Sequence, residues 1–434
     1  MQPNTADRSQ IRRLAELAGL PPTDAILKAL KKGTLRGEKP ATIFAACPNS
    51  EAVTKASIRA AKRAESPIKF AATLNQVDTD GGYTGWTQAR FMELVKSEVA
   101  ETGYRGPVIV ALDHGGQWLK DKQAIEGWSL EEATAGVKES LSACIDAGYD
   151  LLHIDPTVDK TLPPGEIIPI KTVIERTVEL MVHAEQHRRG KGISRISYEV
   201  GTEEVHGGLA DLKVFRIFLN GLKSGLSEHG LTDVWPCFVV GKVGTDLHTT
   251  VFDPQIASAL VEIAGQWGSM IKGHYTDMVE NPEAYPASGM GGANVGPEFT
   301  EAEYEALKKL CLTEEGLFSG GEQKVSGLME ALKAAVVRSG RWEKWRLTHE
   351  QGLPFNKLSP ERQEWLVRTG CRYIWTEPGV LEARGCLYRN LGDRDIDAEK
   401  EVIEAIIRSM NKYFKAFNLE NTLGRIEREL EKGL

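Results

Sequence analysis

An apolar stretch of β-strand character, residues 108–112, ends directly in an acid and an imidazole, Asp113 and His114, and two glycines follow. A carboxylate beside an imidazole can transfer a proton, and either group can bind a cation. Parallel β/α proteins carry their chemistry where strands end in such side chains. The pair therefore marks this point of the chain as a candidate active site.

Further strand-like stretches end in, or are soon followed by, residues that can bind metal. They are His153 and Asp155, Glu199 and Glu203, His248, and His274 with Asp277. Imidazole combined with carboxylate suits Zn²⁺, Mn²⁺, Co²⁺ or Ni²⁺. If the strand ends converge, the sequence predicts a divalent cation of one of these elements, bound by His114, His248 and His274.

A single histidine at a strand end is more often a hydrogen-bonded structural residue than a ligand. The metal hypothesis rests on His114, His248 and His274 together, because all fall where predicted strands end while polar residues are expected to be nearly absent from the strand bodies. The other histidines on predicted helices or polar loops are interpreted as surface or structural residues: His183, His187, His206, His229 and His349.

Eight strand-like stretches, with room for a helix in each gap, provide the elements that would position these residues. They are residues 42–46, 68–74, 108–112, 151–154, 195–200, 235–240, 270–273 and 292–295. Between the third and fourth, Ser129 and Glu132 can form a capping box, and Gly148 can end the helix. Because parallel strands need such crossovers, the pattern predicts an α/β fold, a (β/α)8 TIM barrel. The alternative is an open doubly wound sheet, which would need a glycine-rich phosphate loop that residues 45–49 do not form.

The predicted domain organisation has three parts. Residues 1–40 form an N-terminal helical extension, residues 41–300 form the barrel with the metal site, and residues 301–434 form a mostly helical C-terminal cap region. In the last part, stretches rich in Glu, Lys and Arg predict helices, and the aromatic run 372–375 is a local exception.

Composition excludes several classes of function. The chain has 434 residues, a formal net charge of -8 and 41% hydrophobic residues, so a nucleic-acid partner is not expected. Its six Cys are scattered without a C-x-x-C pair, as is usual in a reducing compartment. The N-terminal stretch is polar, and no apolar run is long enough to cross a membrane. We therefore predict a cytoplasmic protein without a membrane partner.

Several short motifs resemble the Z-type subunit family of bacterial tagatose-bisphosphate aldolase. The motifs are Asn75-Gln76-Val77-Asp78, Gly81-Gly82-Tyr83-Thr84-Gly85, Asp113-His114, Val200-Gly201-Thr202-Glu203, His248-Thr249 and His274-Tyr275-Thr276-Asp277. The resemblance runs from about residue 40 to about residue 410 and includes Val295-Gly296-Pro297 and Arg372-Tyr373-Ile374-Trp375. That family includes tagatose-6-phosphate 4-epimerases and is related to the class II, metal-dependent ketose-bisphosphate aldolases, which are (β/α)8 barrels.

The resemblance implies a role for individual residues. His114, His248 and His274 match the metal ligands of class II aldolases, and Asp113 matches their catalytic acid/base. Glu203 matches a carboxylate that serves as a second proton carrier or lies beside the metal. Asp155 falls where some of these enzymes hold a second cation.

The sequence departs from the family pattern at two places, one after the third predicted strand and one after the fourth. Residues 111–117 differ from the usual Z-subunit stretch Gly-Gly-Asp-His-Leu-Gly-Pro and are closer to the catalytic aldolases. Asp155 is followed by Pro156 and Thr157 rather than by Cys and Ser, so the phosphate or sugar groups accepted there are open.

Further polar residues are predicted to bind the substrate. Asn75 and Gln76 have the donors and acceptors to hold a polyhydroxy ligand, although the adjoining glycine-rich stretch 81–85 is equally well explained as a tight turn. The predicted substrate-binding residues are Asn75, Gln76, Asp78, Tyr83, Asp155, Asp277 and Asn294.

These expectations lead to a predicted function as an isomerase: a metal-dependent ketohexose 4-epimerase. It would act on tagatose 6-phosphate, or on free tagatose or fructose, by retro-aldol cleavage and re-addition at the C3–C4 bond. The alternatives are a non-catalytic accessory subunit of a class II tagatose-1,6-bisphosphate aldolase, an aldolase that releases triose products and, more remotely, a sugar-binding barrel. Expected partners are the ketose or ketose phosphate, a catalytic aldolase subunit in the accessory case, and further copies of the chain in a homo-oligomer.

Overall fold

The computed structural model describes residues 9–163, 166–201, 209–246, 250–318 and 324–433. Within these ranges eight parallel strands form a closed barrel in chain order. The strands are β1 (Ile43–Ala46), β2 (Ile68–Thr73), β3 (Val108–Gly115), β4 (Leu151–Ile154), β5 (Ser197–Gly201), β6 (Phe238–Val240), β7 (Met270–Gly273) and β8 (Gly292–Val295). Because β1 pairs with β8 from Ile43↔Gly292 to Ala46↔Val295, the sheet has no open edge. The predicted (β/α)8 barrel is confirmed, and the open-sheet alternative is wrong.

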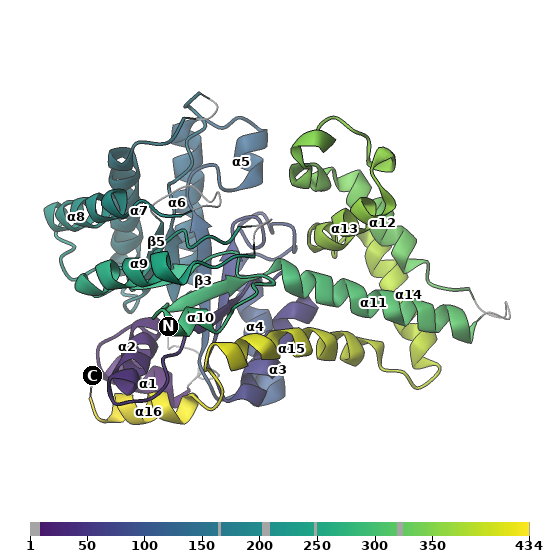
Figure 1. Cartoon of the computed structure of the whole chain (residues 1–434), viewed down its shortest axis with the longest axis horizontal. Coiled ribbons are helices and arrows are strands. Elements are labelled where there is room, and N and C mark those ends of the chain that lie inside the picture. Colours follow the sequence, from purple (N-terminus) through teal and green to yellow (C-terminus); the bar gives the residue numbers. More distant parts are fainter. Residues whose placement is uncertain (1–8, 164–165, 202–208, 247–249, 319–323, 434) are drawn as a thin grey trace.

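Helices follow the strands and cover the barrel (Figure 1). They are α3 (Glu51–Ala64), α4 (Gln88–Thr102), α5 (Asp121–Ile125), α6 (Leu130–Ala147), α7 (Ile170–Gly190), α8 (Leu212–Glu228), α9 (Pro254–Gln266), α10 (Ala284–Ala287) and α11 (Pro297–Leu317). The predicted capping box of Ser129 and Glu132 is present at the start of α6. Gly148 ends that helix with a left-handed φ of 90°, which glycine adopts without strain.

The amino ends of the strands are covered by α1 (Gln10–Leu17), α2 (Pro22–Leu35) and α16 (Leu423–Glu431), which pack together (Figure 1). The Arg12 guanidinium on α1 donates hydrogen bonds to the Asp150 carboxylate at 2.6 and 2.8 Å and to the carbonyl of Val108. On α2, the Asp24 carboxylate accepts a hydrogen bond from the Ser197 hydroxyl at the start of β5. The two ends of the chain therefore close the face of the barrel opposite the candidate site.

The C-terminal region contains α12 (Leu328–Ser339), α13 (Pro360–Gly370), α14 (Pro378–Gly392) and α15 (Ala398–Ala416), with the 3₁₀ helices η1 (Arg341–Trp345), η2 (Thr348–Glu350), η3 (Phe355–Lys357) and η4 (Cys371–Tyr373). Figure 1 shows α12, α13 and α14 beside the outer half of α11, whereas α15 runs back to the barrel along α3 and α11. The helix α11 spans residue 300, and the division into three parts stays a prediction. No helix in the described ranges has the length and apolar character that a membrane crossing needs.

Candidate active site

A local irregularity in β3 positions the Asp113–His114 pair. The strand extends to Gly115, so the pair lies within β3 rather than after its end as the sequence suggested. The pairing between β3 and β4 shifts register between Leu112 and Gly115, and His114 has a positive φ of 53°. Such a bulge rotates a side chain out of the regular alternation. Asp113 and His114 can therefore both turn toward the centre of the barrel mouth.

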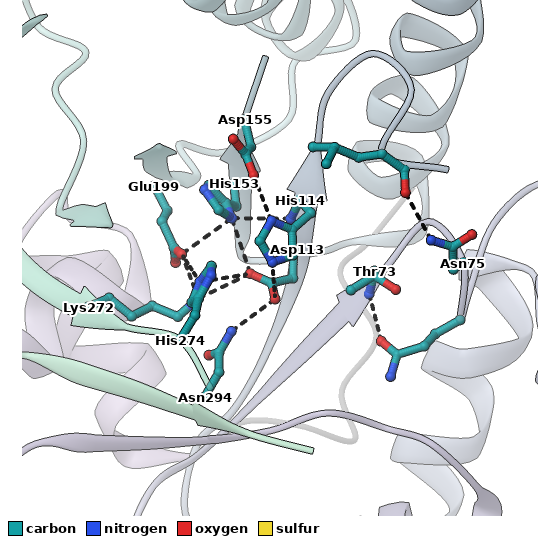
Figure 2. Close-up of polar contacts among 12 residues, drawn as sticks. Thr73, Asn75, Asp113, His114, His153, Asp155, Glu199, Lys272, His274 and Asn294 are labelled. Carbon is teal, nitrogen blue, oxygen red and sulfur yellow. Dashed lines mark hydrogen bonds and ion pairs between the residues drawn. The ribbon is translucent and has the colours of Figure 1, made fainter. Parts of the chain in front are cut away.

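Polar and charged side chains from other strands surround Asp113 inside the barrel, and Figure 2 shows Glu199, Lys272 and Asn294 among them. The Lys272 ammonium on β7 lies 3.2 Å from Asp113 Oδ1 and 2.5 Å from Glu199 Oε1. The other Glu199 oxygen accepts a hydrogen bond from Lys69 on β2, at 2.9 Å. Asn294 on β8 donates to Asp113 Oδ2, also at 2.9 Å. All five side chains are at least 95% buried, so the carboxylates are held by fixed protein cations and donors rather than by solvent.

Charge pairing decides the ionisation of this cluster. Burial by itself would raise the pKa of Asp113, but the Lys272 ammonium, followed by the imidazole of His114, outweighs it and holds that pKa well below its usual range. Glu199 behaves in the same way: burial opposes its charge, and Lys272 and Lys69 keep its pKa well below normal. Both carboxylates are therefore ionised at neutral pH, and Asp113 can accept a proton.

Imidazole rings of His114, His153 and His274 converge on these carboxylates. The His114 ring centroid lies 4.6 Å from that of His274 and 5.2 Å from that of His153. His274 Nε2 lies 3.6 Å from both Asp113 Oδ1 and Glu199 Oε1. His153 Nδ1 lies 3.1 Å from Asp113 Oδ1 and accepts a hydrogen bond from the backbone N–H of His114, at 3.1 Å.

The donor set fits a divalent cation. Among the described residues, ligand atoms of Asp113, His153, Glu199 and His274 lie within 4.8 Å of one another, as do those of His114, His153 and Asp155. The buried Nε2 atoms of His153 and His274 have no hydrogen-bond partner in the described structure, which is costly for a polar atom unless something binds there. Burial lowers the pKa of His274 to about 4, so its neutral ring keeps a lone pair for a metal.

Asp155 orients one of the predicted ligands. Its Oδ2 lies 2.6 Å from His114 Nδ1, and its Oδ1 accepts a hydrogen bond from the Thr157 hydroxyl at 2.6 Å. A histidine that binds metal through one ring nitrogen usually donates the other N–H to a carboxylate in this way. The contact leaves Nε2 of His114 facing the cluster, 3.8 Å from Asp113 Oδ2.

The structure thus brings several predicted site residues together: Asp113, His114, His274, Asn294 and Asp155. The predicted metal ligand His248 and the predicted proton carrier Glu203 lie outside the described residues. The roles assigned to all of these residues stay predictions.

Other predicted substrate-binding residues make hydrogen bonds within the protein. Asn75 bridges the carbonyl of Leu119 and the N–H of Asp121. Gln76 and Tyr83 both donate to Asn49 Oδ1, at 2.7 and 3.0 Å.

Asp78 and Asp277 are held at two other places. The Asp78 carboxylate binds Lys120, Gln88 and Ser140. Asp277 accepts hydrogen bonds from the backbone N–H groups of Gly296 and Glu298, at 2.9 and 2.8 Å, and so caps the start of α11. Burial raises the pKa of Asp277 to about 7 despite these two bonds.

Sequence reasoning missed the cationic half of the cluster. The expectation that polar residues are nearly absent from the strand bodies is wrong. His153, Glu199 and Lys272 lie within strands and meet inside the barrel (Figure 2), and Lys69 on β2 is buried against Glu199. His153 and Glu199 were recognised as strand-end groups but not assigned to the site. The available signal was a single charged residue inside each of several otherwise apolar strands. Burying an unpaired charge costs so much free energy that such residues are expected to pair with one another.

Comparison with known proteins shows similarity along most of the chain. Residues 27–421 match the family described as "D-tagatose-1,6-bisphosphate aldolase subunit GatZ/KbaZ-like". A D-tagatose 6-phosphate 4-epimerase from Agrobacterium fabrum is 28% identical over 395 residues, which cover 86% of this chain and 89% of that protein.

Two crystal structures share the fold. A probable tagatose 6 phosphate kinase from Sinorhizobium meliloti superimposes with a TM-score of 0.73 and 22% identity, covering 86% of this chain and 100% of that one. A fructose-bisphosphate aldolase from Campylobacter jejuni superimposes with a TM-score of 0.53 and 11% identity, covering 92% of this chain and 95% of that one. Since the family match covers nearly the whole barrel and the C-terminal helices, the chain belongs to the GatZ/KbaZ-like family of D-tagatose-1,6-bisphosphate aldolase subunits.

Proposed function

We propose that this protein is a metal-dependent ketohexose 4-epimerase, an isomerase that acts on tagatose 6-phosphate or on free tagatose or fructose. The observation that carries the proposal is an ionised, buried Asp113 facing the imidazoles of His114, His153 and His274 at the mouth of the barrel. The 28% identical relative named D-tagatose 6-phosphate 4-epimerase supports the choice of reaction. We further propose that the enzyme is cytoplasmic and homo-oligomeric.

Inverting C4 of a 2-ketose needs cleavage of a bond, because the C4–H proton is too far from the carbonyl to be acidic. Breaking the C3–C4 bond requires a base for the C4 hydroxyl and a stabilising charge for the enediolate fragment. A Zn²⁺, Mn²⁺, Co²⁺ or Ni²⁺ ion held by His114, His274 and His248 would supply Lewis-acid stabilisation of that fragment. Rotation of the aldehyde fragment before the bond re-forms then inverts C4.

Protein groups would move the protons. Asp113 takes the C4 hydroxyl proton and returns it after re-addition. Asn294 and Lys272 hold its two oxygens in place, so the carboxylate is oriented and ionised before the substrate arrives. Glu203 serves the C3 side as the second proton carrier, and Asp155 fixes the tautomer of His114. The C-terminal helical region would retain both fragments.

Product analysis tests the reaction. The purified chain is incubated with tagatose 6-phosphate, free tagatose and free fructose, with and without EDTA. A C4 epimer that forms and disappears with EDTA supports the proposal. Triose accumulation would instead identify an aldolase, and silence that ends when a class II aldolase subunit is added would identify an accessory subunit. Sugar affinity without turnover or metal dependence would identify a binding protein.

Two substitutions separate the roles of the neighbouring residues. Asp113→Asn should keep bound metal and lose turnover by at least about 100-fold, the usual effect of removing a general base. His114→Ala should lose both metal and turnover. His229→Ala, which removes an exposed histidine at the end of α8, is the matched control and should change neither. Full metal stoichiometry in His114→Ala would contradict the ligand assignment.

A further inference from the structure

A cavity of about 350 Å³ lies between the carboxyl end of β7, the first turn of α11 and the C-terminal region. Tyr275 and Asp277 line it from the barrel side, and Trp345, Trp365 and Arg372 line it from the C-terminal side. Tyr275 directly follows His274 in the chain, so the cavity begins at the edge of the candidate active site. Asp277 is among the predicted substrate-binding residues, but no role proposed above uses Trp345, Trp365 or Arg372.

The Arg372 side chain is buried in the wall of this cavity and attracts the Asp277 carboxylate electrostatically, but no carboxylate forms an ion pair with it among the described residues. The residue is 6% exposed, and its guanidinium packs 4.6 Å from the Trp345 ring centroid and 4.9 Å from that of Tyr373. Its Nε has no hydrogen-bond partner, and no acidic group forms an ion pair with it among the described residues. The two rings hold the guanidinium in place but do not neutralise it.

Four acidic residues line the cavity, Asp246, Asp277, Glu298 and Glu301, and the last three have hydrogen-bond or ion-pair partners other than Arg372. Asp277 caps α11 through the N–H groups of Gly296 and Glu298. Glu298 binds Lys412 and the Tyr413 hydroxyl, and Glu301 pairs with Arg368 at 3.0 Å.

The second arginine of the cavity wall, Arg362, has partners within the protein. The Arg362 guanidinium binds the Glu350 carboxylate at 2.8 Å and the carbonyl of Trp345. Arg372 also has Tyr373 as a side-chain hydrogen-bond partner, but it differs from Arg362 because its Nε has no hydrogen-bond partner in the described structure while the residue lines the cavity.

A buried guanidinium stays charged at any physiological pH, so it needs a compensating anion. Its planar donor fork matches the paired oxygens of a phosphate or a carboxylate. Pre-positioning by Trp345 and Tyr373 lowers the entropy that is lost when an anion binds.

We propose that Arg372 is the anchor of an anion-binding subsite that takes the terminal phosphate or carboxylate of the ketose. The part concerning the sugar rests on the proposed function, because it assumes that the C3–C4 bond lies at Asp113. The binding of an anion beside Arg372 does not rest on it. The subsite explains how a region outside the barrel would select anionic over neutral sugars.

Direct binding of inorganic phosphate to the full-length protein tests the subsite separately from turnover. Titration calorimetry at fixed ionic strength should show binding to the wild type and a loss of affinity of about tenfold or more in Arg372→Gln, as expected for a charge-assisted hydrogen bond. Arg346→Gln is the matched control, because Arg346 also stacks on a tryptophan, Trp342 at 4.4 Å, but does not line the cavity. It should bind phosphate like the wild type.

Absence of phosphate binding by the wild type, or equal affinity in Arg372→Gln, would overturn the subsite. Arg372→Lys covers the case in which the Gln variant does not fold. It keeps the charge but not the fork, and should bind phosphate several-fold more weakly, whereas wild-type affinity would overturn the proposal.

Kinetics then identify the source of the anion. In Arg372→Gln, KM should rise about tenfold or more for tagatose 6-phosphate with a small change in kcat, whereas the KM for free tagatose, which has no anionic group, should rise much less. The same KM increase for tagaturonate would show that carboxylates share the subsite. An unchanged KM for both anionic sugars would overturn it. A wild type that binds phosphate through Arg372 but turns over no sugar would refute the proposed function and leave the subsite standing.

Discussion

At the scale of single residues, the site depends on charges that are stable only in one another's presence. Lys69, Glu199, Lys272 and Asp113 form a continuous chain of ion pairs inside a barrel whose strands are otherwise mainly apolar. Removing Lys272 takes the ammonium partner from Asp113, and removing Glu199 leaves Lys69 buried without an ion pair, and an uncompensated buried charge costs more than the pair itself contributes. The same ion pairs keep Asp113 ionised, so its structural role and its proposed catalytic role are linked.

Lys272→Met tests this linkage. It should lower the free energy of unfolding by about 3–5 kcal/mol, because the carboxylates of Asp113 and Glu199 would lose a shared buried partner. Urea denaturation measures the change. Lys138→Met is the control: it breaks the Lys138–Glu179 pair at the surface, where the expected cost is below about 1 kcal/mol. Equal losses of stability in the two variants would show that the buried ion pairs of Lys272 contribute no more than the surface pair of Lys138.

Asp155→Ala tests the orientation of His114. Without the carboxylate on Nδ1, the ring is free to rotate and to change tautomer, so affinity for the divalent cation should fall by about 10–100-fold. Competition with a chelating dye measures it. Asp159→Ala removes a carboxylate that binds Arg176 and Thr161 instead, and should leave metal affinity unchanged. Metal affinity that is insensitive to Asp155 would rule out its proposed positioning role.

At the scale of elements, the ends of β3 and β4 must approach unusually closely for His114 to reach Asp155. Gly116 makes this possible, because a Cβ at that position would lie 1.9 Å from the carbonyl oxygen of Asp155 and 3.0 Å from the nitrogen of Pro156. Both atoms belong to the backbone, so no side-chain rotation relieves the clash. The glycine that follows the bulge is thus a requirement of the site geometry.

Gly116→Ala should therefore separate the two strand ends. We expect a loss of about 1–3 kcal/mol in stability, typical of overpacking, together with weaker metal binding as Asp155 moves from His114. Gly265→Ala provides the contrast, because a Cβ there meets nothing within 4 Å and Gly265 lies inside α9. That variant should gain about 0.5–1 kcal/mol. Thermal unfolding and metal titration measure both, and wild-type behaviour of Gly116→Ala would contradict the steric argument.

At the scale of the whole molecule, the barrel separates stability from chemistry. Its amino end is closed by α1, α2 and α16, and its carboxyl end carries the ionised cluster and opens toward the C-terminal region. In (β/α)8 barrels these faces have distinct roles, stability at the amino end and chemistry at the carboxyl end.

Arg12→Ala tests this separation. It should cost about 3 kcal/mol of stability, because Asp150 would lose its guanidinium partner between α1 and the barrel. Metal affinity and KM, measured below the unfolding temperature, should stay at wild-type values. Arg13→Ala removes the adjacent, exposed arginine and should change stability by no more than about 0.5 kcal/mol. A changed KM in Arg12→Ala would show that the two faces are coupled.

Local patterning was sufficient to predict the barrel. Apolar runs of strand length alternate with capped amphipathic helices such as α6, and this alternation leaves little choice but parallel strands joined by crossovers. The strand boundaries were less certain: β3 runs past Asp113, and β6 starts at Phe238 rather than at residue 235. Ends depend on pairing with neighbouring strands, which local sequence does not encode.

The sequence by itself determined the fold class, the strands that carry Asp113, His114, His274 and Asn294, and the family resemblance. Only the tertiary structure decided which charges meet. Lys69 and Lys272 belong to strands far apart in the chain, and closure of the barrel alone brings both ammonium groups to Glu199. The proposed role of Arg372 likewise depends on a cavity that forms only where the C-terminal region packs beside the barrel. Periodicity reports how each segment is buried, whereas the partner of a buried charge depends on how distant segments pack.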